Sequence, residues 1–218
     1  VNVFGPEWRG PLRTGESPDA RPPITWNEEG NTRENIRWKV ALPGLGHSTP
    51  VIAGNRIFLT AAKSVGDSMP PKMSGAPGAH DNLPITHRHQ FVVLCVDRAT
   101  GKIVWNQSVH EAVPHEGGHH SASLASGSPI TDGRHVYAYF GSYGLYCLDF
   151  DGNIVWDYMP GTLNSKHGHG EGNSPVLDGD TIVINCDHEK RSFVVALDVS
   201  TGEERWKMQR DEVTSWAS

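Results

Sequence analysis

Histidine is the residue type in this sequence best suited to chemistry, because a neutral imidazole ligates Zn, Cu, Ni or Fe. The chain carries 12 histidines. His119-His120 and His167-Gly168-His169 each place two such ligands on one short stretch. Glu116 and Glu171 stand nearby and are able to add oxygen ligands or to fix an imidazole tautomer. The sequence therefore predicts a histidine-based metal site with the ligands His47, His119, His120, His167 and His169.

A simpler interpretation of these histidines stays open: polar loop residues that hydrogen-bond a glycine-rich backbone. Their spacing is irregular, and the sequence contains neither an HExxH motif nor a paired CxxC. The cysteines Cys95, Cys147 and Cys186 are isolated and odd in number, which predicts small buried strand residues rather than a disulfide framework. No Ser-His-Asp arrangement follows from the spacing, so the sequence predicts no catalytic residue.

An internal repeat defines the elements that must position these side chains. Three segments align: Phe91–Trp105, Leu145–Trp156 and Phe193–Trp206. Each contains a short apolar run, an Asp, a glycine turn and a tryptophan, and successive tryptophans are 51 and 50 residues apart. Periods of about 20–50 residues are typical of solenoids and propellers. A β-sandwich would not require one tryptophan motif at a near-constant interval.

Each repeat divides into four short strands rich in Val, Ile, Tyr and Phe, which favour pleated structure. Asp-Gly and Thr-Gly pairs separate the strands and supply the positive φ of tight hairpins. Four antiparallel strands recurring at this interval predict an all-β fold, a β-propeller of four-stranded antiparallel blades. Strand direction alternates within a blade, so successive connections fall on opposite faces.

One of these two faces receives only tight turns, such as Asp132-Gly133 and Thr201-Gly202. The other, the long-loop face, receives every long connection, and function concentrates in long loops on a rigid scaffold. All histidines except His135 fall on the long-loop face. The long connections are residues 43–48, 63–90, 110–127, 160–173 and 187–192.

The run Ala196-x-Asp198-x-x-Thr201-Gly202-x-x-x-Trp206 resembles the tryptophan-docking motif of the pyrroloquinoline-quinone-like (PQQ-like) propeller repeats of the quinoprotein alcohol dehydrogenase-like superfamily. Cys95–Trp105 and Cys147–Trp156 are close variants of the motif. The resemblance implies that each motif tryptophan docks between neighbouring blades. Trp38, in the run NIRWKVAL, is similar to one more such residue on a strand that closes the ring. The expected docking residues are Trp38, Trp105, Trp156 and Trp206.

The expected organisation is three blades plus this closing strand, hence a partial ring and an N-terminal fragment of a longer propeller. We expect an N-terminal extension at 1–34 and the outer strand of the closing blade at 35–42. The blades are expected at 43–109, with an insertion at 63–90, then at 110–158 and 159–208. Residues 209–218 would begin the next blade.

The resemblance implies a secreted or periplasmic bacterial protein, and we interpret the chain as a non-catalytic binding or assembly scaffold of the cell envelope. One alternative is a quinoprotein dehydrogenase that uses PQQ and Ca²⁺, although the sequence lacks the adjacent cysteines common in such enzymes. Another alternative is a propeller with a transition metal held by the histidines. Neither cofactor follows from the sequence itself.

Charge and hydropathy restrict the partners. The formal net charge is −6, which removes a general electrostatic basis for binding nucleic acid. The longest uncharged apolar run, Phe91–Val96, is far too short to span a bilayer. We therefore expect a protein or another envelope component as the partner.

Overall fold

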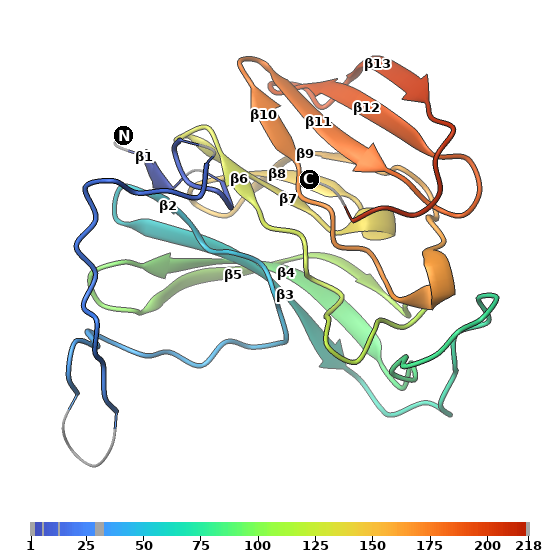
Figure 1. The fold of residues 1–218 in the computed structure, drawn as a ribbon, viewed down its shortest axis with the longest axis horizontal. Helices are drawn as coiled ribbons and strands as arrows, with labels where there is room; N and C mark the ends of the chain where they lie inside the picture. The colour runs from blue at the N-terminus through green and yellow to red at the C-terminus, as the bar shows by residue number, and fades with distance from the viewer. Residues whose placement is uncertain (1–2, 6, 13, 29–32, 217–218) are drawn as a thin grey trace.

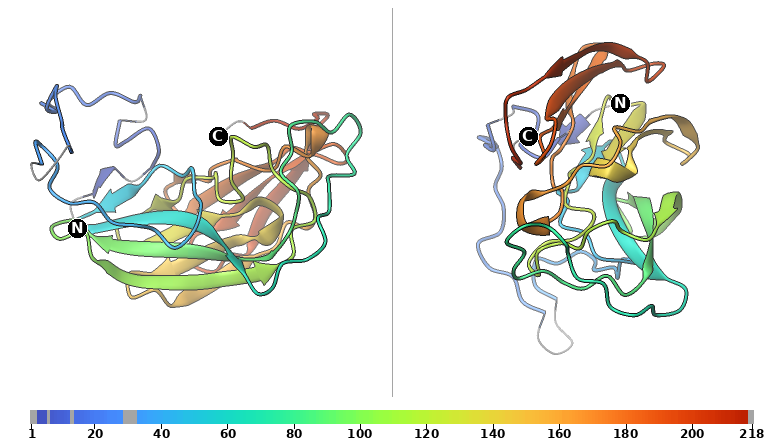
Figure 2. Two further views of the ribbon diagram at one scale, coloured as in Figure 1. Left: turned by 90° about the horizontal axis from the view of Figure 1, so that it is seen from below. Right: turned by 90° about the vertical axis from the view of Figure 1, so that its right-hand side faces the viewer.

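A computed structural model describes the chain except for residues 1–2, 6, 13, 29–32 and 217–218. The described chain folds into three antiparallel sheets that fan out side by side (Figures 1 and 2). Its regular elements are strands and two short 3₁₀ turns, η1 (Gly141–Tyr143) and η2 (Lys166–Gly168). This architecture confirms the prediction of a partial β-propeller with four-stranded antiparallel blades.

Within each sheet the strands follow one another in chain order, as in a meander. The first sheet contains β1 (Val3–Gly5), β2 (Val51–Ala53), β3 (Arg56–Val65), β4 (Arg88–Asp97) and β5 (Ile103–Ala112). The second contains β6 (Ile130–Thr131), β7 (His135–Tyr139), β8 (Leu145–Asp149) and β9 (Ile154–Tyr158). The third contains β10 (Val176–Asp178), β11 (Thr181–Cys186), β12 (Phe193–Asp198) and β13 (Glu204–Gln209).

The first sheet differs from the expected blade at three points. β1, from the predicted N-terminal extension, pairs with β2 and adds a fifth strand, since an open edge offers unpaired backbone groups. Lys63–Val65 and Arg88–Gln90 pair with each other, so the inserted loop is shorter than expected and covers residues 66–87. Residues 35–42, where the sequence predicts an outer strand, contain no strand.

The stretch 35–42 nevertheless alternates in exposure, with Ile36, Trp38 and Val40 partly buried and the residues between them exposed. Trp38 and Val40 pack against the apolar face of the first sheet. Among the described residues no strand pairs with this stretch, so its backbone groups lack the ladder that would make it a strand.

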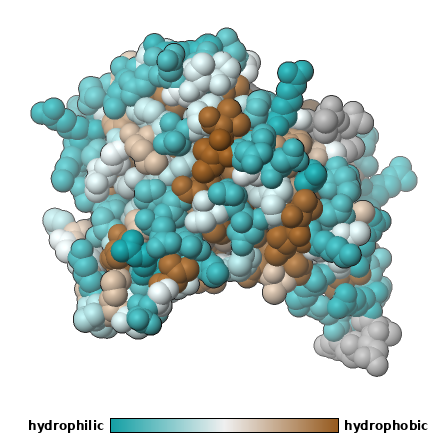
Figure 3. Space-filling view, turned by 180° about the vertical axis from the view of Figure 1, so that it is seen from behind, coloured by the Kyte–Doolittle hydropathy of each residue, from teal (hydrophilic) through white to brown (hydrophobic). Residues whose placement is uncertain are grey.

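Two apolar cores lie between the three sheets, and β8 contributes to both. Tyr146 and Leu148 pack in the core shared with the first sheet, whereas Leu145 and Cys147 pack in the core shared with the third. Successive strand side chains point to opposite faces, so a strand buried on both faces is continuously apolar. This explains why β8 has the sequence LYCL, without alternating polar residues. The outer strands β5, β9 and β13 are more exposed than the strands inside each sheet. Figure 3 shows apolar patches that interrupt the hydrophilic surface.

Three tryptophans make the same contact, each with the turn of a sheet to which the tryptophan does not belong. The indole N–H of Trp105 donates to the carbonyl of Phe150 at 2.8 Å, and that of Trp156 donates to Val199 at 2.9 Å. Trp38 donates to Arg98 at 2.9 Å. Each acceptor directly follows a motif Asp. The three indoles also lie over the motif glycines Gly152, Gly202 and Gly101, where an added Cβ would come within 2.5–2.9 Å of the ring.

The carboxylate of each motif Asp accepts hydrogen bonds within its own turn. Asp149, for example, accepts from the side chain of Asn153 and from the backbone N–H groups of Asn153 and Asp151, all at 2.9 Å. These bonds, the Asn153 side chain foremost, lower the pKa of Asp149. Hydrogen bonds from Thr100 lower the pKa of Asp97, and those from Ser200 and Arg205 lower that of Asp198.

Acid should therefore weaken the fold through these turns. A carboxylate whose pKa is lower in the folded state stabilises the protein above its unfolded pKa, about 3.9 for Asp, and this contribution disappears as pH falls through the folded value. We expect the free energy of unfolding to fall steadily below about pH 4 and to fall less steeply in Asp149→Asn. Urea unfolding between pH 2 and 7 measures how steeply the free energy of unfolding falls with pH in the wild-type protein and in the variant. Asp151→Asn is the control, because that carboxylate accepts no hydrogen bond from the described residues; equal slopes in all three proteins would contradict the prediction.

Candidate functional site

Five imidazoles from three separate connections meet on the long-loop face. They are His80 in the inserted loop, His119 and His120 after β5, and His167 and His169 after β9. The ring centroid of His80 lies 4.8 Å from those of His167 and His169, and that of His119 lies 4.9 Å from His169 and 4.2 Å from His120. We call these five residues the imidazole cluster.

The imidazole cluster contains four of the five predicted metal ligands. His47 is exposed on a different connection, where its backbone N–H donates to Ala125 at 3.1 Å. His80 takes part instead, because the inserted loop folds back over the connections after β5 and β9. Asn82 anchors this loop: its side-chain amide donates to the carbonyl of His167 at 2.7 Å, and its neighbour Leu83 donates from the backbone to Gly118.

Backbone carbonyls orient four of these rings. The Nδ1 atoms of His80, His120 and His167 donate to the carbonyls of residues 78, 81 and 77, and the Nε2 atom of His169 donates to that of His80. A nitrogen that donates to a carbonyl carries the proton, so the other nitrogen of a neutral ring is left with its lone pair. Partial burial is the main cause that lowers the pKa of His119, and the neighbouring imidazoles lower it further, which favours the neutral form of the ring.

A second group lies deeper and brings three potential ligand atoms closer together. His115, Glu116 and Glu171 form it, and we call it the His115 cluster. Its ligand atoms lie within 4.8 Å of one another, the only such group in the described part of the chain. His115 Nε2 is 3.9 Å from Glu116 Oε1 and 3.8 Å from Glu171 Oε1. His115 and Glu116 follow β5, whereas Glu171 precedes β10.

Serine donors hold both carboxylates of the His115 cluster. Glu116 Oε1 accepts from the backbone N–H of Ser165 at 2.8 Å and from its hydroxyl at 2.6 Å. Glu171 accepts from the hydroxyl of Ser142 at 2.6 Å and from the backbone N–H of the same residue. Each carboxylate is thus fixed from a connection other than its own.

Aromatic and backbone groups hold the imidazole of the cluster. His115 Nδ1 lies 2.9 Å from the hydroxyl of Tyr143, and His115 Nε2 lies 2.8 Å from the carbonyl of Leu163. The Tyr143 hydroxyl also accepts the backbone N–H of His115 at 3.0 Å. Tyr143 is itself stacked on Phe91, with ring centroids 4.2 Å apart. The ring therefore has little freedom to rotate.

The two carboxylates carry an uncompensated electrostatic cost. Glu116 is 7% exposed, and burial raises the pKa of Glu171 to about 8 despite the hydrogen bonds from Ser142. Among the described residues neither carboxylate forms an ion pair with Lys or Arg; the ionisable side chains beside each of them are His115 and the other carboxylate. Buried carboxylates are normally paired with a cation or coordinated to a metal.

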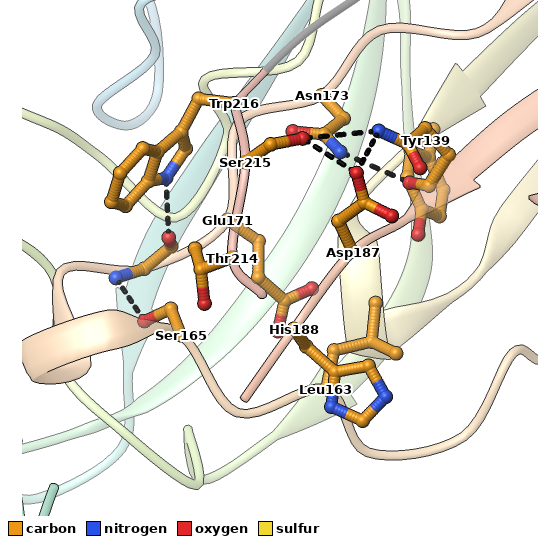
Figure 4. Close-up of a pocket in the computed structure, with 12 residues that line it drawn as sticks. Tyr139, Leu163, Ser165, Glu171, Asn173, Asp187, His188, Thr214, Ser215 and Trp216 are labelled. Carbon is orange, nitrogen blue, oxygen red and sulfur yellow. Dashed lines mark hydrogen bonds between the residues drawn. The ribbon is translucent and has the colours of Figure 1, made fainter. Parts of the chain in front are cut away.

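Cavities give this cluster contact with solvent. One of about 490 Å³ is lined by His115 and Glu116 together with Asn164 and Lys190. A smaller one of about 20 Å³ is lined by Leu163, Ser165 and Glu171 among others (Figure 4). There Asp187 accepts from Arg210 at 2.8 Å and from Ser215 at 2.8 Å, and so fixes the last described residues over the site.

His115 was not among the ligands predicted from the sequence, although Glu116 and Glu171 were named as supporting groups. The sequence prediction rests on pairs of closely spaced histidines and on histidines that precede the innermost strand of a blade, and His115 was selected by neither. Its partners become visible only when the connections after β5 and β9 are placed side by side. A His-Glu dipeptide with a distant Glu has no spacing that distinguishes it from ordinary loop residues.

Comparison with known proteins identifies relatives of the propeller type. The family model described as outer membrane protein assembly factor BamB matches residues 67–215, about two thirds of the chain. The outer membrane protein assembly factor BamB of Yersinia pestis is 29% identical over 122 residues. That alignment covers 55% of this chain and 28% of the relative, so the chain corresponds to only part of that protein's length.

Solved structures with the same type of fold are more distant. Quinohemoprotein alcohol dehydrogenase ADHIIG from Pseudomonas putida HK5 aligns with a TM-score of 0.48 and 15% identity, over 79% of this chain and 22% of that chain. BamB from Moraxella catarrhalis aligns with a TM-score of 0.34 and 16% identity, over 68% of this chain and 51% of that chain.

Proposed function

Because this chain belongs to the family described as outer membrane protein assembly factor BamB, we propose that it is a non-catalytic scaffold that binds a protein partner in the bacterial cell envelope. The single observation that carries the proposal is the family match over residues 67–215, which includes most of the three sheets and their long connections. Among the described residues, no helix is long and apolar enough to cross a membrane.

The long-loop face offers a surface suited to such a partner. The inserted loop and the connection before β2 enclose a groove of about 210 Å³, lined by Leu45, Leu83, Ile85 and Leu124 among others. Leu45 is 70% exposed and Leu83 is 49% exposed. Large apolar side chains grouped at a groove are typical of sites that bind another protein. The tight turns at the opposite ends of the strands are short and polar.

Site-specific photo-crosslinking tests the proposal in cells. A crosslinking amino acid at the position of Leu83 should capture one envelope protein that takes part in outer membrane protein assembly. The same amino acid at Asp151, on the tight turn between β8 and β9, should capture far less. Equal capture at both positions, or capture at Leu83 of abundant cytoplasmic proteins alone, would contradict a scaffold that works through the long-loop face.

A charged residue in the groove should weaken the same complex. We expect Leu83→Asp to reduce crosslinking from a second groove position, Leu45, by about tenfold, because a carboxylate in an apolar contact must be desolvated. Leu83→Met keeps the volume and apolar character and serves as the control. An Asp variant that crosslinks as well as the Met variant would exclude the groove from the interface.

A further inference from the structure

We propose that His115, Glu116 and Glu171 bind one divalent transition-metal ion such as Zn²⁺ or Mn²⁺, a site that does not depend on the scaffold role. The distances are those of a nearly formed site. Nε2 lies 3.9 and 3.8 Å from the two carboxylate oxygens. Zinc binds histidine nitrogen and carboxylate oxygen at about 2.0–2.2 Å. An ion placed between these three atoms would contact all of them after the side chains move inward by only a small distance.

The surroundings of the two carboxylates provide an independent argument. Glu116 and Glu171 are held near each other in a protected position without Lys or Arg as an ion-pair partner among the described residues. Ionising both carboxylates in this position costs hydration and adds their mutual repulsion, so a cation between them would let both carry their charge. A divalent ion balances both charges at once. A purely structural role would be served better by neutral side chains.

The surrounding hydrogen bonds match those of metal ligands. Metal-bound carboxylates and imidazoles are usually oriented by donors and acceptors on their outer side. Ser165 and Ser142 donate to Glu116 and Glu171, and the hydroxyl of Tyr143 faces His115 Nδ1. Metal binding requires the His115 proton on Nδ1, where the Tyr143 oxygen accepts it, so that Nε2 becomes the ligand.

The Leu163 carbonyl completes the oxygen set. In this structure His115 Nε2 donates to it at 2.8 Å, so metal binding must move that proton to Nδ1 and break this hydrogen bond, and the released carbonyl oxygen would then be able to supply a further ligand. A single imidazole with oxygen ligands favours a transition metal, since Ca²⁺ and Mg²⁺ prefer all-oxygen sites. The adjoining cavity of about 490 Å³ gives an ion a path from solvent to His115 and Glu116.

The experiment measures metal binding to the purified, metal-stripped protein. Isothermal titration with Zn²⁺ and Mn²⁺, followed by elemental analysis after dialysis, should give one equivalent of bound metal. Co²⁺ should produce visible absorption bands characteristic of nitrogen and oxygen ligands. Glu171→Gln and His115→Gln should each weaken binding by about a hundredfold, and Tyr143→Phe, which removes the acceptor for Nδ1–H, by about tenfold. Circular dichroism and melting curves establish that each variant is folded.

Two matched controls separate this site from its neighbours. Asp151→Asn changes an exposed carboxylate on the tight turn between β8 and β9 and should leave the affinity unchanged. The double variant His119→Gln/His169→Gln disables the imidazole cluster and should also retain one tightly bound ion. The proposal is overturned if the wild-type protein binds no ion, if only the imidazole variant loses it, or if Ca²⁺ binds as tightly as Zn²⁺.

Discussion

Replacing Trp156 with alanine should lower the free energy of unfolding by about 3–5 kcal/mol, the range for deleting a large buried aromatic side chain. Trp156 is 8% exposed, packs in the core between the second and third sheets, and donates its indole N–H to Val199 at 2.9 Å. The substitution leaves that carbonyl without its donor and opens a cavity beside Gly202. The lost packing contacts should be mainly those between the second and third sheets, whereas the hydrogen-bonded strand pairs within each sheet should be kept.

Trp206→Ala is the matched control for this prediction. Trp206 occupies the same position of the repeat on β13, but it is 46% exposed. We expect this variant to lose less than about 1 kcal/mol, as is usual for surface substitutions. Urea unfolding followed by tryptophan fluorescence and far-UV circular dichroism measures both changes. Equal losses would mean that burial between sheets is not what gives the motif tryptophan its effect, and docking would then be the wrong role for Trp156.

The sheets could be predicted from the sequence because their signals are local and repeated. A strand such as Phe193–Asp198 is marked by its own apolar run and by the Thr201-Gly202 turn that follows. The stretch 35–42 shows the limit of this reasoning: its alternation of exposed and partly buried residues is present, but a strand also needs a partner. β1 shows the converse, since its three residues become a strand by pairing with β2.

The candidate site was predictable only in part, because it depends on which connections lie side by side. The sequence placed the histidines on one set of connections, and four of the five ligands predicted from the sequence lie close together there. Their meeting with His80 depends on how residues 66–87 fold back, which no local pattern encodes. The position of His115 depends on contacts with Tyr143 and Glu171, residues from two other connections.

Gly141→Ala should strongly destabilise the protein and disturb the His115 cluster. Gly141 has φ of +57°, and a Cβ there would overlap the carboxylate of Glu171. A non-glycine residue in this region costs about 1–2 kcal/mol by itself, and forcing extra atoms into a packed site adds about 1–3 kcal/mol. The total expected loss of unfolding free energy is therefore about 3 kcal/mol or more. Thermal and urea unfolding measure it.

Gly179→Ala isolates the part of this loss that comes from the contact with Glu171. Gly179 also has φ of +57°, but a Cβ there would meet nothing within 4 Å. Its expected cost is therefore the backbone term alone, about 1–2 kcal/mol. Since the added methyl at Gly141 must displace the carboxylate that Ser142 holds, that variant alone should also lose the metal affinity assigned to the His115 cluster. Identical losses in the two alanine variants would mean that Glu171 moves aside freely, and a carboxylate that moves freely cannot be a preorganised ligand.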